Sequence, residues 1–251
     1  MICTEPSFDT VARFNELPNL WDADGAKNKQ VTEEAFKTLG QLFVAHHVER
    51  IFGLTLLHNH FSLEEGEILL ETGSLFDSQQ EIVSQPVKVD KLALPIQGFN
   101  WRIINKSYVP YEFRHENKDL KIEFSSPDIQ SFLEEFLQKL NELDLTRIFG
   151  ICTINEGDFM RPGIEYTNGR KNITIPLADS TDTFDKIIEA LWVMLHSIHL
   201  LNKLLPQDKG LFDRFEMRRR YSCRRVGAVR LHASFFSGNQ YLAYEIWGCV
   251  C

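Results

Sequence analysis

Apolar residues recur at three- and four-residue spacing in two stretches of the chain, and this pattern predicts two helices with one buried face each. Thr32 is a suitable N-cap for the first helix. Ser126 is suitable for the second, with Pro127 at the first turn. The apolar positions are Ala35, Phe36, Leu39, Leu42 and Phe43 in the first stretch, and Phe132, Leu133, Phe136, Leu137, Leu140 and Leu143 in the second.

The tetrapeptide RIFG follows each predicted helix, at residues 50–53 and again 97 residues later at 147–150. Strand-like segments come next in both copies: LTLLHNHF and then EGEILLETG in the first, ICTINEGD and then PGIEYTNG in the second. Further extended segments follow in each half. We therefore predict an α+β fold built from two tandem α-β-β repeats with a mainly antiparallel sheet.

A third helix is predicted over residues 181–206, with Asp182 or Thr183 as its cap and Pro206 as its end. Its apolar middle, EALWVMLHSIHLL, indicates that this long C-terminal helix packs against both repeats. The predicted organisation is an N-terminal segment (1–30), a first repeat (31–125), a second repeat (126–180), the helix (181–206) and a basic, aromatic tail (207–251). The closing SFFSGNQYLAYEIWGCVC favours a strand or hairpin.

Composition places the chain among folded proteins, since 251 residues that are 43% hydrophobic can bury a full core. The first residues lack the pattern of a secretory signal, and no apolar run is long enough to span a membrane. Five cysteines without a CxxC pair are typical of reduced thiols. These features favour a cytoplasmic protein with no membrane contact; they leave the oligomeric state open.

Charge is unevenly distributed along the chain. The net charge is −8, yet residues 218–230 hold six arginines and no acid, so that the remaining residues carry −14. An acidic body argues against nucleic acid as a partner. The arginine run has two interpretations: it pairs with the acidic surface, or it contacts an anionic partner.

The strongest candidate for chemistry is the stretch FGLTLLHNHFSLEEG, in which a strand-like run ends in His58 and His60. Alternate residues of a strand share a face, so the two imidazoles should lie side by side at the rim of the core. Glu64 and Glu65 follow at a turn and could supply a carboxylate. We therefore predict an acid/base pair, or a divalent metal held by His58, His60 and Glu64; the second copy has Asn155 in place of His58.

Two further groups of residues complete the predicted site. Tyr111 and His115, in VPYEFRHEN, are placed across a cleft between the repeats, with His115 as a catalytic residue. Arg170 and Lys171 follow the tight-turn pair Asn-Gly and present two cations that could bind a carboxylate or phosphate of a ligand.

The spacing G-x4-H-x-H-x3-E at residues 53–64, followed by P-x-E-x-x-H at 110–115, is similar to the two metal-binding motifs of the cupin barrels. That resemblance implies iron, manganese or zinc held on strands. The first motif is one residue short after its glycine, and Glu112 stands where the second has glycine. The predicted helices also have no place in a cupin barrel.

A second resemblance covers roughly residues 30–180. The stretches FG-x3-LH-x-HF-x-L, at residues 52–63, and GR-x-NI, at 169–173, resemble a group of proteins from filamentous fungi to which no function is assigned. It implies no activity for this chain.

Two functions fit the sequence. The first is a small-molecule enzyme with an apolar cleft, of lyase, isomerase or cyclase type, or one that carries out metal-assisted hydrolysis; nineteen phenylalanines suit an apolar substrate. The second is a non-catalytic protein-interaction module in which the histidines are structural. The residues alone do not decide between them.

Overall fold

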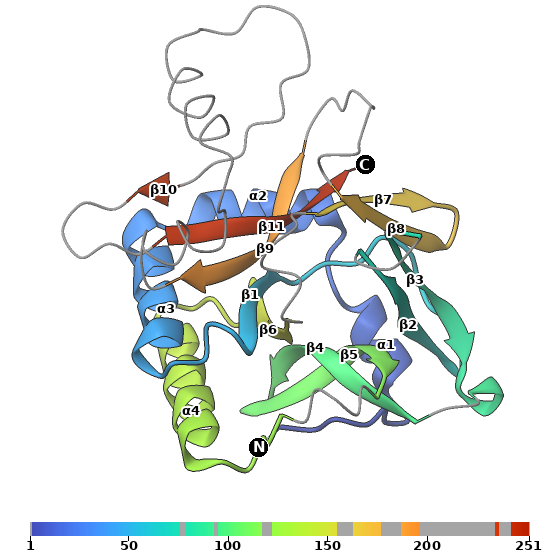
Figure 1. Cartoon of the computed structure of the whole chain (residues 1–251), viewed down its shortest axis with the longest axis horizontal. Helices are drawn as coiled ribbons and strands as arrows, with labels where there is room; N and C mark the ends of the chain where they lie inside the picture. The colour runs from blue at the N-terminus through green and yellow to red at the C-terminus, as the bar shows by residue number, and fades with distance from the viewer. Residues whose placement is uncertain are drawn as a thin grey trace, which may run out of the picture.

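The strands lie side by side in one strongly curled sheet, with two helices stacked against one side (Figure 1). The structure is a computed structural model. It describes residues 2–75, 79–92, 95–116, 122–154, 163–176, 187–195, 234–235 and 242–250, the backbone alone for residues 195, 234–235 and 242–250. The helices are α1 (Thr10–Asn15), α2 (Leu20–Gln30), α3 (Glu33–Ala45) and α4 (Pro127–Glu142), with a short 3-10 helix, η1 (Val89–Lys91). The strands are β1 (Phe52–Leu56), β2 (Glu67–Ser74), β3 (Glu81–Lys88), β4 (Ile96–Ile104), β5 (Ser107–His115), β6 (Phe149–Thr153), β7 (Gly163–Asn168), β8 (Lys171–Pro176), β9 (Ile188–Leu195), β10 (Ser234–Phe235) and β11 (Leu242–Val250).

Nine of the described strands follow one another across the sheet in the order β7-β8-β3-β2-β5-β4-β6-β1-β9. Within this series only β2 and β5 run parallel, so the sheet is mainly antiparallel. β11 pairs with β9 on one side and, in parallel, with β7 on the other. The curled sheet is therefore joined end to end through β11, as Figure 1 shows near the top of the view.

The largest core lies between α3, α4 and the strands β1, β6, β4 and β9. Thr32 caps α3 by accepting a hydrogen bond from the Ala35 amide at 3.1 Å. Phe43 of α3 meets Phe132 of α4 edge to face, with ring centroids 4.9 Å apart, and Phe132 stacks on Phe52 of β1. The apolar faces that the sequence periodicity predicts for α3 and α4 are thus the faces buried in the structure.

The two RIFG copies are built alike. Each preceding helix ends in a residue with positive φ, His47 (56°) in the first copy and Asp144 (57°) in the second. The main-chain bonds Val48 N to Phe43 O and Leu145 N to Leu140 O then recur 97 residues apart. β1 pairs antiparallel with β6 and sets Leu54 opposite Ile151, and the Leu57–Ile148 bond is mirrored by Ile154–Ile51.

A glycine in each copy lets the next strand come close. A Cβ on Gly53 would lie 3.1 Å from the carbonyl oxygen of Trp192 in β9, and one on Gly150 would overlap the carbonyl oxygen of Trp101 in β4. Both tryptophans are buried in the helix-facing core. At these two positions glycine therefore allows the backbones of neighbouring strands to approach closely.

The α+β class and the mainly antiparallel sheet are confirmed, but the predicted helix over residues 181–206 is not. Ile188–Leu195 forms β9, while residues 181–186 and 196–206 lie outside the described residues. Ala190, Trp192, Val193 and Met194 are all buried, so both faces of this strand are covered. A strand covered on both faces is apolar at nearly every position, as β9 is apart from Glu189, and such a sequence cannot be told from that of a buried helix.

The tandem α-β-β repeats are also not confirmed, because each helix is followed by more than two strands and strands of the two segments are interleaved, with β1 between β6 and β9. The segment NWRIINKSYVPYEF is a hairpin rather than one extended piece, turning at Asn105 and Lys106, which both have positive φ. The closing segment pairs β10 with β11 antiparallel, as a hairpin would. Residues 1–30, which had no predicted element, contain α1 and α2.

Candidate metal centre

His58 and His60 lie in the loop that joins β1 to β2, not on the strand, which ends at Leu56. The segment around α1 holds this loop. The Asn59 amide donates to the Pro18 carbonyl, and its side chain donates to the Leu17 carbonyl, both at 2.8 Å. Farther along, Leu63 and Asn15 exchange a reciprocal pair of hydrogen bonds of 2.8 and 2.9 Å. The imidazoles are therefore carried by a loop with a defined path.

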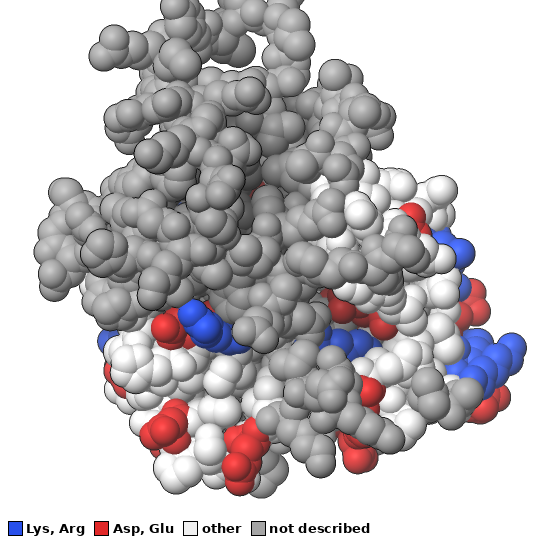
Figure 2. Space-filling view, viewed as in Figure 1, with Lys and Arg blue, Asp and Glu red and all other residues white. Residues whose placement is uncertain are grey.

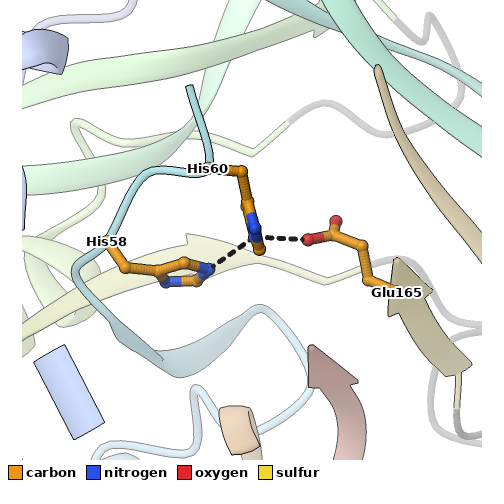
Figure 3. A group of neighbouring side chains, drawn as sticks. All are labelled: His58, His60 and Glu165. Atoms are coloured by element: carbon orange, nitrogen blue, oxygen red, sulfur yellow. Dashed lines mark hydrogen bonds and ion pairs between the residues drawn. The ribbon is translucent and has the colours of Figure 1, made fainter. Parts of the chain in front are cut away.

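Three side chains converge in front of this loop (Figure 3). The Nε2 atoms of His58 and His60 are 3.1 Å apart, and His60 Nε2 is 2.9 Å from Oε1 of Glu165 on β7. One ligand atom from each residue lies within 4.8 Å of the other two. The side chains of His60 and Glu165 are 5% and 18% exposed, so the cluster is largely shielded from solvent.

His58 presents a lone pair to the cluster. Its Nδ1 is 2.8 Å from the Leu56 carbonyl oxygen, which can only accept a hydrogen bond, so Nδ1 carries the proton and Nε2 bears the lone pair that faces His60 Nε2. Burial and, secondarily, the neighbouring His60 lower the pKa of His58 to about 4. A neutral imidazole whose second nitrogen donates to a carbonyl is the form in which histidine binds metals.

Two of the three separations within the triad match those between ligands of one metal ion. With metal–ligand bonds of about 2.1 Å, two ligand atoms lie about 3.0 Å apart at right angles and about 3.4 Å apart in a tetrahedron. The observed separations of 3.1 and 2.9 Å fall at the right-angle value. Two imidazoles and one carboxylate on one side of an ion are the donor set of many iron, manganese and zinc sites.

Other carboxyl groups face the same region. Burial is the main cause that raises the pKa of Glu112 to about 8; a hydrogen bond from Asn100 opposes the rise, and the carboxylates of Glu165 and Glu71 add to it. Asn100 Oδ1 is itself buried and accepts no hydrogen bond from the described residues. Glu112 therefore keeps its proton at neutral pH, and the carboxylates of Glu165 and Glu71 are the negative charges that act on it.

The predicted carboxylates Glu64 and Glu65 lie apart from the triad. The Glu64 side chain is 70% exposed and forms ion pairs with Arg170 at 3.5 Å and Lys88 at 3.9 Å. The Glu65 carbonyl accepts a hydrogen bond from Lys88. In the structure, the carboxylate next to the histidines is therefore that of Glu165.

The remaining predicted site residues are also dispersed. Tyr111 is buried in the cluster beneath α1, where burial raises the pKa of its hydroxyl well above the usual value. His115 ends β5 opposite Ile96, and its Nδ1 is buried without a hydrogen-bond partner in the described part of the chain. Arg170 binds Glu67, whereas Lys171 is exposed at the start of β8. None of these four is part of the triad.

Sequence reasoning missed Glu165, which lies more than a hundred residues beyond the histidines. No local sequence pattern points to it, because its place depends on the pairings of the sheet. Val83 pairs with Ile173; one residue farther along their strands, Ser84 pairs with Glu71 and Thr174 pairs with Glu165. Glu165 and Glu71 thus lie at corresponding positions on the two sides of the β3–β8 pair.

Two surface recesses lie away from the triad. One is lined by Ser131, Glu134, Glu135, Gln138 and Lys139 of α4, the other by residues between Pro6 and Val11 together with Gly66, Glu67, Ile68 and Val89. On the described part of the face in Figure 2, lysines and arginines lie among acidic residues and do not form one basic area. Among the described residues, no helix combines the length and apolar character needed to cross a bilayer.

Comparison of the chain with models of protein families, with curated proteins and with solved structures finds no match.

Proposed function

We propose that this chain binds one divalent transition-metal ion through His58 Nε2, His60 Nε2 and Glu165 Oε1, and that the ion acts as a Lewis acid in small-molecule chemistry. The observation that carries the proposal is the convergence of these three side chains from two segments far apart in the sequence, with His60 Nε2 at ligand-like distances from both His58 Nε2 and Glu165 Oε1. The neutral state of His58, whose pKa is lowered to about 4, supports it.

Three protein ligands leave coordination positions open for a water molecule or an oxygen atom of a substrate. An ion held there would make bound water a nucleophile at neutral pH or polarise a carbonyl. Glu112, whose pKa is raised to about 8, keeps a proton at neutral pH that a nearby reaction could use. The reaction classes that fit are a metal-assisted hydrolysis and a lyase, isomerase or cyclase reaction that proceeds through a polarised carbonyl.

The test is metal binding by the full-length chain without an affinity tag. Protein freed of metal with a chelator is titrated with Zn²⁺ and with Co²⁺, and binding is followed by calorimetry and by visible absorption. We expect one ion per chain, with affinity lowered at least 100-fold in His60→Ala and in Glu165→Gln. His47→Asn is the matched control, because His47 is exposed at the end of α3 and asparagine tolerates its positive φ.

Either of two results would reject the site: no stoichiometric binding by the wild-type chain, or wild-type affinity in both His60→Ala and Glu165→Gln. Equal losses in His47→Asn would indicate nonspecific binding to histidines.

We also propose that the fold arose by internal duplication, in units longer than α-β-β. The two units are α3-β1-β2-β3-β4-β5 and α4-β6-β7-β8-β9-β11. Their strands correspond in order, β1 to β6, β2 to β7, β3 to β8, β4 to β9 and β5 to β11. Each pairing then has a counterpart of the same direction: β1–β9 corresponds to β6–β4, and β2–β5 to β7–β11. The two units are interleaved, with β6 between β4 and β1 and β1 between β6 and β9, so each unit completes the sheet of the other.

A further inference from the structure

The turn between β7 and β8 carries an arginine that reaches back to the loop holding the histidines. Arg170 follows Gly169, which has a φ of 62°, and its Nη2 donates to Glu67 Oε2 at 2.6 Å and to the Ser62 carbonyl at 2.9 Å. Its Nη1 is 3.5 Å from Glu64 Oε1. One guanidinium thus contacts three residues at the C-terminal end of the β1–β2 loop and the start of β2.

These contacts are stronger than an ordinary surface ion pair. The Glu67 side chain is only 9% exposed, and its Oε2 also accepts a hydrogen bond from the Glu64 amide at 2.7 Å. The hydrogen bond from Arg170 is the main cause that lowers the pKa of Glu67. A buried carboxylate held by a planar guanidinium fixes both direction and distance, which a lysine cannot do equally well.

The same hairpin supplies the carboxylate of the triad. Glu165 lies on β7, five residues before Arg170 in the turn, while His58 and His60 lie in the loop that Arg170 contacts. The α1 segment holds the other side of this loop through Asn15. The separation between the imidazoles and Glu165 therefore depends on how firmly the β7–β8 turn and the loop are joined.

We propose that Arg170 is a positioning residue for the metal centre, joining the histidine loop to the hairpin that carries Glu165 and so setting the distance between them. The proposal rests on the proposed metal-binding function. It gives Arg170 a role different from the anion site that its sequence context suggests.

The experiment compares four full-length proteins: wild type, Arg170→Gln, Arg170→Lys and Lys171→Gln. Lys171 is the matched control, because it is a neighbouring, exposed cation of the same turn. Each protein is titrated with Co²⁺ alone, and its visible absorption spectrum is recorded at saturation. We expect Arg170→Gln to weaken Co²⁺ binding about 10- to 100-fold and to change the spectrum at saturation, because an outer contact orients the ligands. Arg170→Lys should recover part of the affinity, and Lys171→Gln should match the wild type.

A merely structural role would lower the unfolding midpoint without altering the saturated spectrum, and that result would overturn the proposal. Wild-type affinity in Arg170→Gln, or an equal loss in Lys171→Gln, would overturn it as well. A second measurement does not depend on metal: the ¹⁵N chemical shifts of the imidazoles in the metal-free proteins should move for His60 in Arg170→Gln and stay fixed in Lys171→Gln. If wild-type protein binds no Co²⁺, the proposed function fails. The ¹⁵N shift of His60 in Arg170→Gln then tests by itself whether Arg170 positions the histidines.

Discussion

Lowering the pH should destabilise the metal-free protein through His58. Burial and His60 lower the pKa of this imidazole from its ordinary 6.5 to about 4. Between these two values the unfolded chain binds the proton and the folded chain does not, so the free energy of unfolding falls as the pH falls. The contribution is complete above pH 6.5 and is lost by pH 4.

The size of the effect follows from the two pKa values. The loss of unfolding free energy from this one group is about 2 kcal/mol at pH 5 and about 3 kcal/mol at pH 3.5, taking about 1.36 kcal/mol per pKa unit. Other groups titrate in the same range, so the effect must be read as a difference between proteins. His58→Asn removes the titration and keeps an N–H donor for the Leu56 carbonyl.

The assay is urea unfolding in the presence of a chelator at several pH values between 7.5 and 3.5, followed by tryptophan fluorescence. The stability gap between wild type and His58→Asn should shift in favour of the variant by about 2 kcal/mol between pH 7.5 and pH 5. His47→Asn should keep the wild-type pH dependence. Parallel pH profiles for wild type and His58→Asn would refute the assignment of a buried, neutral imidazole to His58.

Three further predictions concern the core and the charged interior. Gly150→Ala should lower the free energy of unfolding by about 3 kcal/mol, measured by urea unfolding, because the added Cβ overlaps the backbone carbonyl of Trp101; an unchanged midpoint would contradict this. Tyr108→Phe should cost about 1 to 2 kcal/mol in the same assay, since the buried Tyr108 hydroxyl donates to the Leu133 carbonyl at 2.6 Å; a neutral effect would mean that this bond contributes nothing. The pKa of Glu112 is raised from 4.5 to about 8, so the unfolded chain loses its proton first and wild-type stability falls as the pH rises between these values. Glu112→Gln should therefore gain up to about 4 kcal/mol relative to wild type between pH 4 and pH 9 in a pH series of unfolding curves, and a constant difference would show that Glu112 is not buried as a neutral acid.

Local patterns predicted the parts of the fold that local interactions determine. α3 and α4 have polar outer faces, so their apolar positions recur with the period of a helix. β9 has no polar face, since Trp192 and Val193 are both buried although they point to opposite sides of the strand, and it carries no period to detect. The hairpin turn at Asn105 was missed because its second residue is a lysine, which rarely adopts positive φ.

In the candidate site, too, the residues close together in the sequence were predicted, whereas the residue brought in by the fold was not. His58 and His60 were predicted to lie side by side from the alternation of a strand; the strand ends at Leu56, yet the path of the loop brings their Nε2 atoms within 3.1 Å. Their carboxylate partner depends on which strand faces the loop, and that is set by the pairing of the β7–β8 hairpin with β3. Glu64 and Glu65 were chosen because they are close in sequence, whereas Glu165 is close in space.

The equivalent pairing of the two RIFG strands bears on the order of folding. Each helix, its turn and the strand after it make contacts only a few residues apart, as in the bond from Val48 to Phe43 or from Leu145 to Leu140, so both units can form early and separately. Docking β1 on β6 closes a loop of about a hundred residues and should come later, in a slower step. Substitutions within either helix–turn–strand unit should then slow refolding, while those at the Leu54–Ile151 contact should mainly speed unfolding.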